Sequence, residues 1–98
     1  MNYIDEMIDK VEEEIGGAVD YAEESIKCRA KGHTDRANRY KSMAMDELTH
    51  AETIRNFTTQ DIEEIKRVYS IPVEDEEKWH KAHRKFNELI GAIKLMLN

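Results

Sequence analysis

Residues 40–54 read YKSMAMDELTHAETI and place two ionisable side chains in an otherwise apolar helical stripe. Residues spaced three or four apart form one row, with Ala44, Ala51 and Thr58 beside it, and its members are Tyr40, Met43, Glu47, His50, Ile54 and Phe57. Glu47 stands at the centre of this row. Because burial of an unpaired carboxylate is unfavourable by several kcal/mol, we expect a cation or a proton to compensate it.

Glu47 and His50 stand three residues apart, so both side chains project from one face of the helix. This is the spacing by which one helical turn offers two ligands to a metal ion. Carboxylate oxygens with one imidazole suit iron or manganese, and zinc would also be accepted. The second carboxylate should come from the facing helix, where Glu14 is the one acid in the apolar row. The predicted metal ligands are therefore Glu14, Glu47 and His50.

Composition narrows the classes of partner that this chain can bind. The net charge is -6 over 98 residues, with 37% charged residues, and the pI is about 5.2. An acidic chain without clustered Lys and Arg is a poor ligand for nucleic acid or for anionic membranes. No stretch reaches the roughly 18 apolar residues that span a bilayer. Cys28 is the single cysteine, which fits a reducing compartment, so we expect a cytoplasmic protein.

The periodicity predicts an all-α chain forming one helical domain over residues 1–98, with helices at about 2–31, 35–69 and 74–97. Gly32 is the expected stop of the first helix and Pro72 of the second. The short first loop makes the first two helices an antiparallel hairpin. The third helix should bury Trp79, Ala82, Phe86, Leu89, Ile93 and Met96. A domain this small has a thin stability margin, so we expect a homo-oligomer, a dimer or higher.

Gly16 and Gly17 interrupt the first helix two residues after Glu14. Each glycine is less favourable than alanine in a helix by up to about 1 kcal/mol. Two interpretations remain open. The pair is either a weak spot in the helix or a place where the facing helix or a site approaches closely.

The pattern resembles the ferritin-like di-iron carboxylate proteins, in which one helix provides Glu, a tyrosine follows two turns later, and the antiparallel partner provides Glu-x-x-His. Glu14, Tyr21, Glu47 and His50 match this half-site, over the first two helices. The resemblance implies binding of ferrous iron and its oxidation by oxygen or peroxide, with Tyr21 as the catalytic tyrosine. Ferritin-like chains normally repeat the set on a second helix pair, whereas this chain has one further helix.

Two completions of the site follow from this departure. If the second helix is continuous, two copies of the hairpin must meet and form a four-helix bundle across a dimer. Such an arrangement resembles that of encapsulated ferritins. If the second helix breaks near Thr58, the third helix could bring His83 or Glu76 to the site. The favoured prediction is the continuous helix.

Each residue also has a structural interpretation without metal. Glu47 could pair with Arg29 across the hairpin, Glu14 could belong to a solvated acidic run, and Tyr21 could pack in the core. The alternative function is then a non-catalytic self-association or adaptor module that binds no metal.

Overall fold

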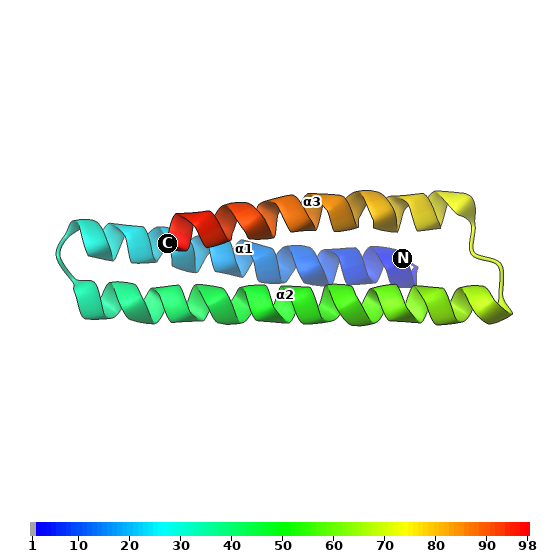
Figure 1. Cartoon of the computed structure of the whole chain (residues 1–98), viewed down its shortest axis with the longest axis horizontal. Helices are drawn as coiled ribbons and strands as arrows, with labels where there is room; N and C mark the ends of the chain where they lie inside the picture. Colours follow the sequence, from blue (N-terminus) through cyan, green and yellow to red (C-terminus); the bar gives the residue numbers. More distant parts are fainter. Residues whose placement is uncertain (1) are drawn as a thin grey trace.

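Three long helices lie side by side in the computed structural model, which describes residues 2–98 (Figure 1). They are α1 (Tyr3–Ala30), α2 (Thr34–Val68) and α3 (Val73–Leu97), and the molecule measures 55 × 22 × 16 Å. The part of the chain described contains no strand, so the all-α prediction is confirmed there. The helix ends lie within one residue of those expected from the periodicity.

The helix ends follow local signals in the sequence. Asn2 caps α1, since its side-chain oxygen accepts a hydrogen bond from the Asp5 amide at 2.9 Å. Gly32 takes a φ of 79°, the left-handed conformation that ends a helix without steric penalty. Thr58 lies inside α2 and its hydroxyl donates to the Ile54 carbonyl at 2.7 Å. Because α2 is continuous through this point, the alternative of a break near Thr58 is wrong.

Small side chains let α1 and α2 approach closely along their length. Ser25, fully packed between the two helices, donates from its hydroxyl to the Ala37 carbonyl at 2.7 Å. Alanines fill the same contact further along, Ala18 and Ala22 on α1 and Ala44 and Ala51 on α2, all with no exposed surface. Tight packing of this kind gains dispersion energy over many atom pairs and leaves little space for water.

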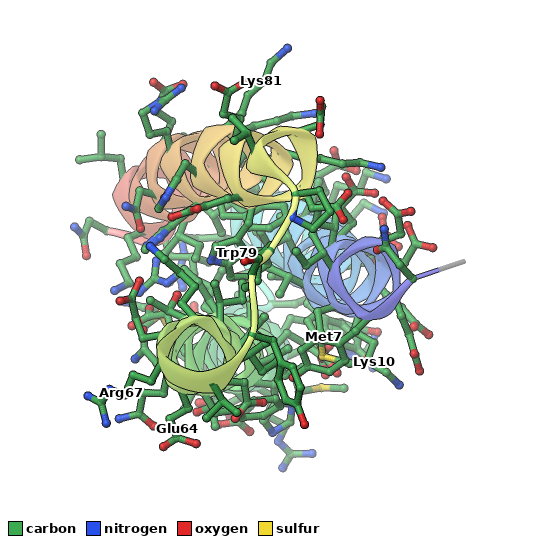
Figure 2. The ribbon with its side chains drawn as sticks, turned by 90° about the vertical axis from the view of Figure 1, so that its right-hand side faces the viewer. Met7, Lys10, Glu64, Arg67, Trp79 and Lys81 are labelled. Atoms are coloured by element: carbon green, nitrogen blue, oxygen red, sulfur yellow. The ribbon has the colours of Figure 1, made fainter. Side chains whose placement is uncertain are left out.

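Helix α3 covers one side of the hairpin and stops short of the α1–α2 loop (Figure 1). The Trp79 indole donates to the Thr59 hydroxyl at 3.2 Å and lies between the three helices, whereas Met7 lies on the side of the hairpin away from α3 (Figure 2). The buried residues of α3 are Trp79, Phe86, Ile90, Ile93 and Leu97. The prediction was therefore wrong for Leu89 and Met96, which are 37% and 41% exposed.

Helix α2 carries two adjacent rows of residues. The first, here called the core row, is buried and consists of Ala37, Ala44, Leu48, Ala51, Thr58 and Ile62. The second, the outer row, is half-buried or exposed and consists of Arg36, Tyr40, Met43, Glu47, His50, Ile54, Phe57 and Asp61. Most of the outer row was expected to form the core. The buried face instead lies one residue further along, because the small residues there allow α1 to approach.

Candidate metal site

Helices α1 and α2 bring the three predicted ligands together near the middle of the hairpin. One ligand atom from each of Glu14, Glu47 and His50 lies within 4.8 Å of the others. His50 Nδ1 stands 3.5 Å from a Glu14 carboxylate oxygen and 3.9 Å from one of Glu47. Glu14 on α1 therefore lies at the same height as Glu47 on α2, as the sequence predicted.

These separations approach those of a metal coordination sphere. Imidazole nitrogens and carboxylate oxygens bind zinc at about 2.0–2.2 Å, so two of its ligands can lie at most about 4.4 Å apart. The three groups meet or nearly meet that limit before any side-chain rotation. The arrangement can thus hold one ion after small rotations, with its remaining coordination positions open.

The carboxylates of Glu14 and Glu47 repel each other when both are ionised. The glutamate side chains are 28% and 26% exposed for Glu14 and Glu47, and that of His50 is 58% exposed. A hydrogen bond with the Glu14 carboxyl, together with burial and the nearby Glu14 charge, raises the pKa of Glu47 above its ordinary value. The glutamates therefore lie at the edge of the core rather than inside it, and a proton or a cation relieves their repulsion.

Gly17 makes room for the Glu47 carboxylate. A Cβ atom at Gly17 would lie 2.9 Å from a Glu47 carboxylate oxygen, closer than real Cβ atoms approach, whereas one at Gly16 would meet nothing within 4 Å. The two neighbouring glycines therefore differ. The close-approach interpretation holds for Gly17, and Gly16 is an open position on the helix surface.

Tyr21 lies outside the immediate cluster. It is seven residues from Glu14 on the same helix, about 10 Å along the axis. Its ring stacks on that of Tyr40, with 6.2 Å between the centroids, and packs against the core. The catalytic role of Tyr21 stays a prediction, and its observed contact is with the aromatic ring on α2.

Other residues named in the alternatives are occupied elsewhere. Arg29 donates to the Asn38 side chain at 3.0 Å near the hairpin loop, so it does not pair with Glu47. Glu76 accepts from Lys66 at 2.6 Å on the far part of α2. Burial lowers the pKa of His83, which lies beside Trp79. Neither Glu76 nor His83 joins the cluster.

Two residues of the hairpin were not assigned correctly from the sequence. Tyr40 was counted as a core residue, although it is half-buried and stacks on Tyr21, outside the cluster. Gly17 was left ambiguous, and its position three residues after Glu14 was the signal that it shares a helix face with that ligand.

Among the described residues no helix is long and apolar enough to cross a membrane. Comparisons with protein-family models, with curated proteins and with solved structures find no match to this chain.

Proposed function

We propose that this protein binds metal ions through Glu14, Glu47 and His50, with iron as the preferred ion and manganese or zinc as acceptable substitutes. The observation that carries the proposal is the meeting of these three groups from two helices, with ligand atoms within 4.8 Å of one another. Two carboxylates and one imidazole form the hard, oxygen-rich donor set that suits such ions.

The charge balance of the cluster supports a cation. Within residues 2–98, Glu14 and Glu47 form ion pairs with His50 and with no lysine or arginine. The raised pKa of Glu47 has the same origin, since its carboxylate lies against that of Glu14. A divalent ion between them would neutralise both charges, as a salt bridge would in an ordinary interface.

A second copy of the chain would complete the coordination. One chain offers three side-chain ligands, fewer than the four to six donors that these ions take. The outer row around the cluster exposes Met43 at 40% and Phe57 at 42%, an apolar surface of the kind that marks association sites. Two hairpins meeting there would give a four-helix bundle with a two-ion site between the copies, the arrangement that the ferritin-like resemblance implies.

Glutamine substitution at Glu14 tests the metal site, with Glu13 as its matched control. Both are glutamates on α1, but Glu13 lies on the exposed face and outside the cluster. Protein purified from iron-supplemented cells should contain about one iron per chain in the wild type and in Glu13→Gln. Glu14→Gln should lose at least ten-fold in affinity for Fe²⁺ or Mn²⁺ by titration calorimetry. Equal metal content in all three proteins would contradict the proposal.

Bound iron would supply one-electron chemistry, and the chain's own residues would hold and shield it. Catalytic oxidation of iron by the protein is tested separately, by following ferric absorbance and oxygen consumption after addition of Fe²⁺. Turnover that is lost in Glu14→Gln and kept in Glu13→Gln supports iron oxidation. Stable binding without oxygen consumption supports a structural metal.

The second candidate function is a metal-free self-association module. The exposed apolar residues of the outer row favour it, because they serve association with or without an ion. It predicts dimers in EDTA, no bound metal after purification, and a Glu14→Gln variant that associates like the wild type.

A further inference from the structure

The outer row of α2 has an internal symmetry that extends on both sides of the two proposed metal ligands it contains. Its eight members are centred on the point between Leu48 and Thr49. Residues at equal distances from this point match in pairs, and the pairs are Arg36 with Asp61, Tyr40 with Phe57, Met43 with Ile54, and Glu47 with His50. The outer pair and the central pair join groups of opposite or complementary charge, and the two pairs between them join apolar side chains.

We propose that two copies associate with α2 packed antiparallel on the partner's α2 in the register set by this symmetry. Arg36 then lies opposite the partner's Asp61, and Tyr40 lies opposite the partner's Phe57. Met43 meets the partner's Ile54, and Glu47 meets the partner's His50. A two-fold axis perpendicular to the helices makes each contact occur twice, as in other isologous dimers. This inference rests on the proposed function for the existence of the dimer, and it adds the orientation and the contacts.

Charge and shape distinguish this register from its neighbours. A slip of one heptad in one direction sets Glu47 against the partner's Phe57, an uncompensated carboxylate against an aromatic ring. A slip of one heptad in the other direction sets Arg36 against the partner's Ile54. Parallel packing of the same row would set each Arg36 against another Arg36. Only the antiparallel register sets Arg36 against an acid and Glu47 against an imidazole.

The face is open for such a contact. Helix α3 packs on the other side of the hairpin, where Trp79 donates to Thr59 of α2 and Lys94 pairs with Glu52 of α2 at 3.0 Å. Figure 2 shows α3 and Trp79 on this side. Arg36, Met43, His50 and Phe57 are exposed in the single chain, whereas the other members of the row are half-buried. Asp61 accepts a hydrogen bond from the Tyr3 hydroxyl at 2.5 Å and keeps its second carboxylate oxygen for the partner's Arg36. The centre of symmetry lies between Glu47 and His50, so the axis brings the two metal clusters to the same place.

Cysteine cross-linking tests the register directly. In a Cys28→Ser background, Tyr40→Cys and Phe57→Cys are made as separate chains, mixed with Mn²⁺ present and oxidised with diamide. The mixture should give a disulfide-linked dimer of the two variants. Either variant alone should not, because like positions 40 and 40 lie seventeen residues apart in this register, about 26 Å.

The alternative two-fold axis, parallel to the helices, would set α2 over the partner's α1. Tyr40→Cys would then cross-link with a separate Tyr21→Cys chain and not with Phe57→Cys, and that result would overturn the register. Bound Mn²⁺ measured on the same samples separates the two proposals. Metal without the 40–57 link contradicts the register alone, and the link without metal contradicts the metal site alone.

Charge reversal gives a second measurement that needs no cysteine. Arg36→Glu alone and Asp61→Lys alone should each dimerise at least ten-fold more weakly, because each brings like charges together twice. An equimolar mixture should recover dimers, since both contacts become complementary in the heterodimer. Circular dichroism of each variant alone shows whether it keeps the helicity of the wild type. With helicity kept, failure of the mixture to recover dimers would contradict the register.

Discussion

The two rows of α2 occupy the same helix, have the same spacing and differ in what they contact. The core row meets α1 with alanines, Leu48 and Thr58, all without exposed surface. The outer row carries larger and charged side chains and remains partly open to solvent. The row with smaller side chains is the one that is buried, because a close approach of two helices excludes large side chains. The row of mostly small and uncharged side chains therefore became the core, and the other row remained half-buried or exposed.

The largest expected effect is a difference in stability between the two rows. Leu48→Ala removes a fully buried side chain and should lower the free energy of unfolding by about 3 kcal/mol. Met43→Ala, five residues away on the outer row, should lower it by less than about 1 kcal/mol in monomeric protein. Urea unfolding of both variants at low protein concentration measures this. Equal losses would show that the rows do not differ as described.

The two adjacent glycines should differ next most strongly, in metal affinity. Gly17→Ala pushes the Glu47 carboxylate out of its position, so the affinity for Mn²⁺ should fall about ten-fold, a typical loss when the support of a ligand is disturbed. Gly16→Ala adds a methyl group in open space and should leave affinity unchanged. Both gain up to about 1 kcal/mol of helix stability. Titration calorimetry and thermal unfolding on both variants separate positioning from stability.

Acid–base behaviour should distinguish Glu47 from a solvated acid. A raised pKa means that the folded protein holds a proton that the unfolded chain has released, so the stability from this group is present below the ordinary pKa of 4.5 and lost as the pH rises through the raised value. Metal-free Glu47→Gln should lack this loss and be more stable than the wild type at pH 7. Thermal unfolding in EDTA between pH 4 and 8 measures the difference between the two proteins.

The smallest expected effect lies at the end of the outer row. The Tyr3 hydroxyl donates to Asp61 at 2.5 Å, and burial with this contact raises the pKa of Tyr3 to about 12. Since Tyr3 is 37% exposed, Tyr3→Phe should cost about 0.5–1 kcal/mol below pH 10. The wild type should lose this advantage as the pH rises from 10 to 12. A constant difference between the two proteins over that range would show that the hydroxyl is not the cause.

Local signals accounted for the helices, because Asn2, Gly32 and Pro72 act through the backbone of their own neighbourhoods. The grouping of Glu14, Glu47 and His50 was also predictable, since helical spacing and an antiparallel hairpin bring the two elements to one height. Burial could not be predicted in the same way. Periodicity gives the same spacing for two adjacent rows, so the row with Glu47 was expected in the core, although a quarter of the Glu47 side chain is exposed.

The amino-acid sequence by itself determined three helices, their ends, the hairpin and the grouping of Glu14, Glu47 and His50. Only the tertiary structure decided which row of α2 is buried, which glycine makes room for the Glu47 side chain and which side of the hairpin α3 leaves open. The physical reason is that spacing along a helix is a local property. Burial depends on how closely a second helix can approach, and that distance is set by the side chains of both helices together.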